Sequence, residues 1–509
     1  MVDWKELYST RHLTDLTVTE ILESILACQT GRIEKFNRII YFGYDAKDTL
    51  LRHSAAAVNS EDFLARRNAI LGCLHRTIAI RQWNDLRIGK HVSLECALGA
   101  FDMFVLKTSR GDLDDISQKL GEIVSLILTE CPSIVDFSPR ERALRIAQYL
   151  RENNLTGIDP GSDFYNLEHN FLGLALRDER HNSVPLISAA IYCYVARKFD
   201  LNAQLCGFPF HVHVLIEPEY GYDMDGWRVE GGTQGPPMYM DPFRSVRETP
   251  VSELQSQLNF LGTLSLSQST FLRESLTGEI VLRCGKNILN AIKQSTMSTV
   301  VLLDITSAAY AAIWSSILCA NYSALENSPQ ELGSRVPIVQ FRRYLPSLLE
   351  YFATNFPFDV YLVEQYLVPL FYGFPEYDHL KESVYVMKAG DQIPKQIKRR
   401  TAEYSNVKYR VGQVFRHRRY GYVAVIAGWD PECGAAEHWM QQMGIDRLRA
   451  GRVEDASVRY VAEENILPIQ PQISEIPRSF LEFLGKHFKR WDSIAHCFVS
   501  NIRDEYPDD

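Results

Sequence analysis

Three short segments in the middle of the chain carry residue types that could do nucleophilic or acid–base chemistry. They are a helix start, a strand that bears histidines and a second strand that bears an aspartate. Their candidate residues are Ser183, Pro185, Ser188, His211, His213 and Asp241. The sequence contains no GxxxxGK[ST], GxGxxG, HExxH or GxSxG pattern. The common signatures of nucleotide-binding proteins, zinc proteases and serine hydrolases are therefore absent.

The order of helix start, His strand and Asp strand resembles the core of the transglutaminase-like superfamily. There a Cys at a helix N-terminus attacks an acyl group, the strand His takes the thiol proton and the Asp orients the imidazole. A helix N-terminus and a nearby His both favour the thiolate. The resemblance implies that His211 and Asp241 occupy the His and Asp positions. It also implies that Ser183-Val184-Pro185 stands where the family has Gly-Val-Cys. We therefore predict a degenerate core with no catalytic activity and no cofactor.

Two replacements for the missing nucleophile stay open as alternatives. Cys206 lies five residues before His211 and could approach it, which would make the chain a thiol acyl-transferase or protease. Free cysteine is, however, commonly a small buried apolar residue. Ser183 and Ser188 are weaker candidates at the helix start. Neither alternative displaces the prediction of a non-catalytic core.

A metal site is the other reading of the histidines. His211, His213 and Glu217 fall on one face of a single strand by the two-residue period. No further pair of ligands is spaced nearby, and structural zinc sites need four. We therefore predict no metal.

A C-terminal segment resembles the YccV-like domain, also called HspQ-like and named for hemimethylated DNA binding. The likeness is carried by residues 408–422, 426–432, 437–440 and 459–468. It implies a small β-barrel. Between Arg452 and Val453 the family has a short aromatic-bearing segment that this chain lacks, so we expect a shortened barrel strand there.

Basic residues gather just before and inside this segment. Residues 395–419 hold nine Lys and Arg against one acid, Glu403. The candidates for phosphate contact are Lys398, Arg399, Arg400, Arg416, Arg418 and Arg419. We expect any duplex binding to be weak and sequence-tolerant, with the first three residues lying in a linker outside the barrel. The alternative is a solvated linker with no DNA role.

The combination of the two domains resembles certain eukaryotic F-box proteins, the substrate receptors of SCF-type ubiquitin ligases. Residues 3–11, 43–47, 98–102 and 111–116 extend this likeness over almost the whole chain. The F-box itself is not recognised in the sequence, so we expect no tight binding to the SCF linker subunit. The resemblance implies a non-catalytic adaptor whose partners are protein substrates and SCF components.

The elements that must position these residues form an α+β multidomain protein. Its 509 residues suggest about three domains, and a charge of -9 confines any nucleic-acid contact to a local patch. We predict a helical region at 1–90, the degenerate transglutaminase-like core at 91–250 and a helical bridge at 251–394. A barrel at 405–470 and a tail at 471–509 follow.

Cysteine usage and hydropathy indicate where such a protein works. Ten dispersed cysteines without a CxxC pair or a signal peptide favour a reducing compartment, cytoplasmic or nuclear. The apolar stretch 299–320 contains Asp304, so we predict a buried helix there and no membrane partner.

Overall fold

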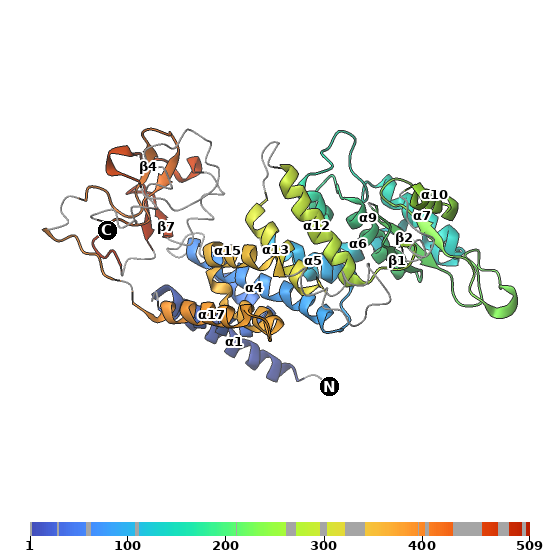
Figure 1. Cartoon of the computed structure of the whole chain (residues 1–509), viewed down its shortest axis with the longest axis horizontal. Coiled ribbons are helices and arrows are strands. Elements are labelled where there is room, and N and C mark those ends of the chain that lie inside the picture. The colour runs from blue at the N-terminus through green and yellow to red at the C-terminus, as the bar shows by residue number, and fades with distance from the viewer. Residues whose placement is uncertain are drawn as a thin grey trace. The chain divides into compact units, whose positions relative to one another are not determined.

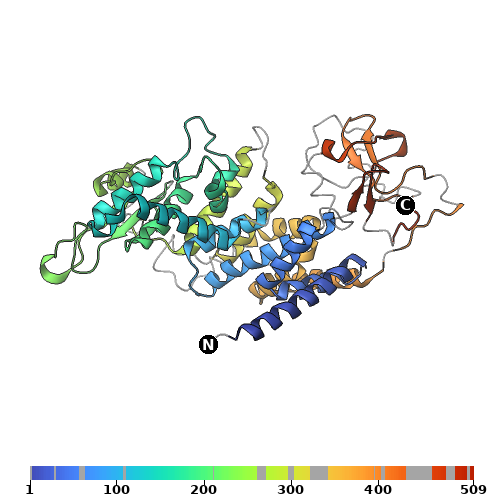
Figure 2. The same ribbon diagram turned by 180° about the vertical axis from the view of Figure 1, so that it is seen from behind.

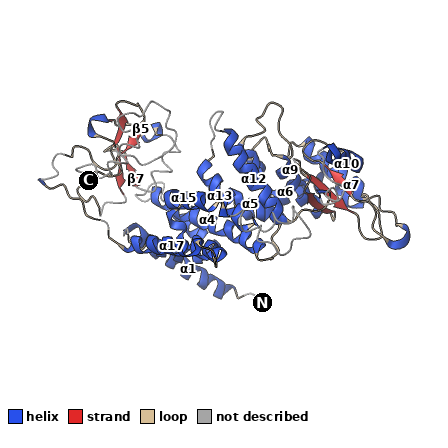
Figure 3. Cartoon of the chain, viewed as in Figure 1, coloured by secondary structure: helices blue, strands red, loops and turns tan. Residues whose placement is uncertain are grey.

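Helices dominate the part of the chain that the structure describes, and the strands of that part form three small sheets (Figures 1 and 3). The computed structural model describes residues 3–27, 30–56, 63–106, 111–209, 211–260, 271–295, 303–320, 342–394, 396–402, 407–430, 461–476, 488–500 and 505–509. Two compact units are present, His75–Pro357 and a second unit that joins Met1–Leu74 to Phe358–Asp509. The predicted α+β multidomain class is confirmed.

The unit His75–Pro357 contains one antiparallel sheet with helices packed on it. Its helices are α4 (Phe63–Arg87, which begins in the other unit), α5 (Leu94–Val105), α6 (Leu113–Glu130), α7 (Pro139–Glu152), α8 (Leu172–Arg177), α9 (Pro185–Lys198), α10 (Val251–Phe260), α12 (Thr277–Ser295), α13 (Ile305–Leu318) and α15 (Leu345–Asn355). The sheet has the order β1 (Asn202–Cys206), β2 (His213–Glu217), β3 (Met238–Met240). The strands β1 and β2 are antiparallel neighbours, with Cys206 opposite His213. The chain between β2 and β3 extends away from the sheet as a long arm (Figure 2).

Aromatic packing builds the core around α5. The ring of Trp83 lies 4.8 Å from that of Phe101, and its indole donates to the Ala97 carbonyl at 3.0 Å. The helices α12 and α13 pack on each other and on α5. They therefore belong to this core and not to a bridge. Helical periodicity shows which face of a helix is apolar, but it does not show which neighbour covers that face.

The described part of the apolar stretch 299–320 is the buried helix α13, as predicted. Asp304 is its N-cap, and its carboxylate accepts hydrogen bonds from the amides of Thr306 and Ser307. Among the described helices, none combines the length and the apolar character needed to cross a membrane.

The second unit joins segments that lie more than 300 residues apart. Its helices are α1 (Trp4–Ala27), α2 (Arg32–Tyr41), α3 (Tyr44–Ala56), α16 (Val360–Leu362) and α17 (Glu376–Gln392). The Gly31 amide donates to the Asp391 carbonyl at 2.9 Å, and the rings of Phe36 and Phe358 stack at 4.2 Å. The division between the units therefore does not follow the expected boundaries at residues 90, 250 and 394.

A small β region completes the second unit. One sheet has the order β5 (Val423–Val425), β4 (Val414–His417), β6 (Ile466–Pro468), and β7 (Phe488–Asp492) pairs with β8 (Cys497–Ser500). The core contains Val411, Val414 and Trp429 together with Ile476, Phe488, Phe498 and Tyr506. Described residues of the segment 471–509, which was expected to be a tail, thus supply part of this core. A closed barrel is not seen in the described strands, and the Arg452–Val453 junction lies outside the described residues.

Candidate functional site

The sheet register brings His211 and Asp241 together. Asp241 follows β3 directly, His211 lies two residues before β2, and Val214 of β2 pairs with Met240 of β3. His211 Nε2 is 2.8 Å from Asp241 Oδ2, and both residues are buried. Burial alone would raise the pKa of Asp241, but the hydrogen bond and charge of His211 lower it. The arrangement is an imidazole held in place by a carboxylate.

His213 is a second buried imidazole beside this pair. Its ring centroid lies 5.0 Å from that of His211. Burial, followed by the charge of His211, lowers the pKa of His213 to about 4, so this ring is neutral near pH 7. The strand begins at His213, so His211 and Glu217 do not share one strand face as expected. The described residues contain no group of three or more His, Cys, Asp or Glu side chains that could hold a metal ion.

Pro185 opens α9, the helix that packs on β1 and β2. Proline suits this first position because its missing amide would have no partner within the helix. The preceding Ser183 donates its amide to the Gly157 carbonyl at 2.8 Å. The buried hydroxyls of Ser183 and Ser188 lie 2.6 Å apart, and the Gly157 amide donates to Ser188 Oγ at 3.0 Å. These hydroxyls link the segment before α9 to its first turns, and among the described residues neither is hydrogen-bonded to a base.

Cys206 pairs with His213 in the register of β1 and β2. Its thiol, however, donates to the Phe271 carbonyl at 2.9 Å. Burial raises the pKa of Cys206 to about 12. The thiol therefore stays protonated and hydrogen-bonded to the backbone, which is the opposite of an activated nucleophile.

The basic residues expected to act together separate into two groups. Lys398, Arg399 and Arg400 do not lie in a free linker, because they pair with acids of the β region. Lys398 Nζ is 2.6 Å from Asp430 Oδ1, and Arg400 is ion-paired with Asp509. The charge count could not show this, because Asp430 lies 32 residues beyond Lys398 and Asp509 lies 109 residues beyond Arg400.

The other group is exposed on the hairpin between β4 and β5. Arg416, Arg418 and Arg419 all have exposed side chains. His417 shapes the turn, since its Nδ1 accepts the amides of Arg419 and Tyr420, both at 3.2 Å. The hairpin therefore displays three exposed guanidinium groups, that of Arg416 from β4 and those of Arg418 and Arg419 from the turn.

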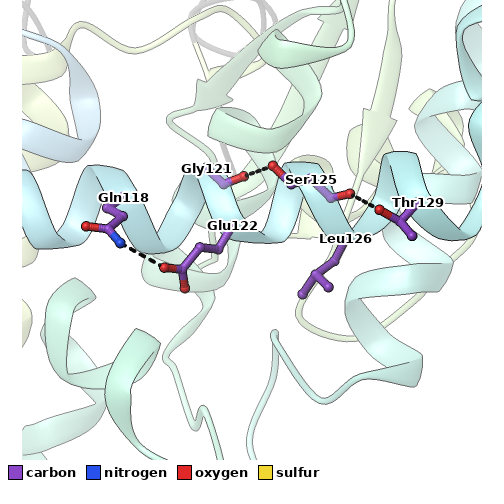
Figure 4. A pocket seen from close by; sticks show the side chains of 6 residues that line it. All are labelled: Gln118, Gly121, Glu122, Ser125, Leu126 and Thr129. Atoms are coloured by element: carbon purple, nitrogen blue, oxygen red, sulfur yellow. Dashed lines mark hydrogen bonds between the residues drawn. The ribbon is translucent and has the colours of Figure 1, made fainter.

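Two further features were missed by sequence reasoning. Asp102 lies on α5 with a fully buried carboxyl whose pKa burial raises to about 7. The signal for it was an acid inside the apolar run of residues 96–105. The second feature is an open groove along α6, shown in Figure 4. There the hydroxyls of Ser125 and Thr129 donate to carbonyls of their own helix, so they offer no reactive group.

Two family models match the chain. The model described as transglutaminase-like superfamily matches residues 112–285. The model described as hemimethylated DNA-binding protein YccV like matches residues 407–494. The chain carries a transglutaminase-like domain and a YccV-like domain. The first contains the His211–Asp241 pair and the start of α9. The second extends beyond the expected end at residue 470 and includes β7.

Named relatives of this two-domain chain are F-box proteins. It is 36% identical over 117 residues to F-box only protein 21 of Mus musculus. It is 35% identical over 117 residues to the proteins of the same name from Pongo abelii and Homo sapiens. Each match covers 20% of this chain and only 19% of the relative. No solved structure matches the chain.

Proposed function

We propose that the chain is a non-catalytic adaptor that binds proteins destined for ubiquitin-dependent turnover. The observation that carries this proposal is Pro185 at the first position of α9, where the family resemblance expects a thiol. Proline has no nucleophilic atom, and a general base without a nucleophile does little. The transglutaminase-like domain then keeps the scaffold and the His211–Asp241 pair but serves as a surface for binding proteins.

The link to ubiquitin rests on the likeness to F-box only protein 21 over 117 residues. The F-box proteins that this chain resembles are the substrate receptors of SCF-type ubiquitin ligases. Protein substrates and SCF components would then be the partners of this chain. Such a role belongs in the cytoplasm or nucleus, and ten dispersed cysteines without a CxxC pair are compatible with either compartment.

Protein turnover in cells tests the adaptor role. Proteins captured with the tagged chain are identified, and their half-lives are compared in cells with and without it. We expect at least one captured protein to turn over at least twofold more slowly without the chain. Blocking cullin-type ubiquitin ligases should remove that difference. Unchanged half-lives of every captured protein would contradict the adaptor role.

An activity assay tests the non-catalytic part separately. The purified chain is incubated with glutamine-containing peptides, and both hydrolysis and cross-linking are followed. We expect no activity that depends on His211. If His211→Ala reduced a measured rate about a hundredfold or more, the scale of a general base, the domain would be an enzyme.

DNA binding through the YccV-like domain is a second candidate, supported by the exposed arginines of the β4–β5 hairpin. Contacts from Arg416, Arg418 and Arg419 to phosphates would hold a duplex without reading its sequence. Three such contacts predict that log affinity falls with log salt at a slope of roughly -2.7.

Fluorescence anisotropy with hemimethylated and fully methylated duplexes tests this candidate. Changing the three arginines to alanine should abolish binding, whereas Lys119→Ala on the exposed face of α6 should leave it unchanged. Absence of binding at low salt would refute the DNA role. A preference for hemimethylated DNA that survives the triple substitution would mean that another surface reads the base.

A further inference from the structure

The segment 505–509 is held in the β region like a bound peptide. The carboxylate of Asp509 accepts from three donors: Arg400 Nε, the Val411 amide at 3.1 Å and the Trp429 indole at 2.8 Å. Only 2% of this side chain is exposed. An ionised carboxylate with three aligned donors is a strong charge-assisted contact.

Residues 505, 506 and 508 are contacted by different groups of the β region. The Asp508 carboxylate accepts the Arg400 amide at 2.9 Å. The Tyr506 ring lies 5.6 Å from the Trp429 ring, and its hydroxyl is 3.4 Å from Lys398 Nζ. The Lys398 amide donates to the carbonyl of residue 505 at 2.7 Å. Two carboxylates, one aromatic ring and one backbone carbonyl are thus recognised separately.

The receiving side is organised by its own contacts. The Arg400 guanidinium also donates to the carbonyls of Val407 and Tyr409, both at 2.7 Å. Lys398 is held by Asp430 at 2.6 Å. Both cations are therefore positioned by residues 407–430, and only part of their hydrogen-bonding capacity goes to the segment. A preorganised site of this kind loses little conformational entropy when it binds a ligand.

We propose that Lys398, Arg400, Val411 and Trp429 form a binding site for acidic peptides with the pattern Tyr-x-Asp-Asp, and that segment 505–509 is its intramolecular occupant. A partner protein with such a segment would compete for the site. A tethered segment acts at an effective concentration on the order of millimolar, so competition needs the segment to be weakened or a partner to bind more tightly. This inference goes beyond the adaptor and DNA proposals and requires neither.

The test uses the full chain and a fluorescein-labelled peptide, Glu-Tyr-Pro-Asp-Asp. The double variant Asp508→Asn, Asp509→Asn keeps the size of the segment but removes both of its carboxylates. We expect anisotropy to show at least tenfold tighter peptide binding to this variant than to the wild-type chain. A Glu-Tyr-Pro-Asn-Asn peptide should bind at least tenfold more weakly. Adding Arg400→Gln to the double variant should abolish binding.

Folding is followed in the same samples by circular dichroism and tryptophan fluorescence. A folded double variant that shows no peptide binding up to 1 mM would overturn the proposal, as would equal affinity for the two peptides. If the double variant loses the unfolding transition of its β region, the segment is a structural part of the domain and the proposal also fails. These outcomes leave the adaptor proposal untouched, because none of them involves protein turnover.

Discussion

Asp102 gives the sharpest prediction, because its environment sets both the sign and the size of the effect. Its carboxyl is fully buried on α5, and Oδ1 accepts the Leu174 amide at 3.0 Å in the first turn of α8. A Cβ at Gly173 would lie 2.8 Å from Oδ1, so glycine allows this approach. Burial raises the pKa to about 7, although the amides of Gly173 and Leu174 and the charge of Arg177 act to lower it.

The free energy of unfolding should therefore depend on pH in a defined direction. An unfolded Asp has a pKa near 3.9, so the folded protein binds this proton more tightly. Below about pH 4 the Asp102 carboxyl is protonated in both the folded and the unfolded state and does not lower the free energy of unfolding. As pH rises from 4 to 7, the folded state loses about 1.4 kcal/mol per pH unit relative to the unfolded state. The loss reaches about 4 kcal/mol at pH 8.

The substitution Asp102→Asn isolates this effect, because it keeps an oxygen for the Leu174 amide and removes the titration. We expect the free energy of unfolding of the variant to rise relative to that of the wild-type chain as pH rises, by up to about 4 kcal/mol between pH 4 and pH 8. Urea unfolding followed by circular dichroism at unit pH intervals measures this gain. Asp114→Asn, at an exposed carboxyl on α6, is the matched control and should give a nearly constant difference. A difference for Asp102→Asn that is constant, or that shrinks as pH rises, would refute the reasoning.

Three further predictions test the other sites. Pro185→Cys places a thiol at the first position of α9. Mass spectrometry should show that iodoacetamide alkylates this thiol at pH 6 at least tenfold faster than free cysteine, while Cys206 stays unmodified. A slower reaction would contradict the assigned nucleophile position. Above pH 6.5 His213 is neutral in both the folded and the unfolded state and does not change the free energy of unfolding. Its depressed pKa in the folded state lowers that free energy by about 3 kcal/mol as pH falls from 6.5 to 4, so His213→Phe should flatten this acid dependence in thermal melts. If the acid dependence of the melting temperature kept the same slope in the variant, its attribution to His213 would be refuted. Arg400→Gln should destabilise the β region by about 2 kcal/mol or more in urea, and Arg418→Gln by less than about 0.5 kcal/mol; equal losses would show that the Asp509 contact contributes little.

Local sequence determined the element types and the outline of the candidate site. The family resemblance implied that His211 and Asp241 occupy the His and Asp positions of the core, and the pairing of β2 with β3 places them 2.8 Å apart. Pro185 marked the start of α9 because its ring fits only the first turn of a helix. Such features depend on neighbours in the sequence or on a recognisable order of strands, so one chain is enough to read them.

Only the tertiary structure decided how distant segments share a core and which charges are paired. Residues 1–74 pack with 358–509, and the supposed tail supplies Phe488, Phe498 and Tyr506 to the β core. Lys398 and Arg400 looked like solvated charges, but their acidic partners come from Asp430 and from segment 505–509. Burial also sets the pKa values of Asp102 and His213. A charge loses its hydration only when remote segments close around it, so the local sequence carries no record of that loss.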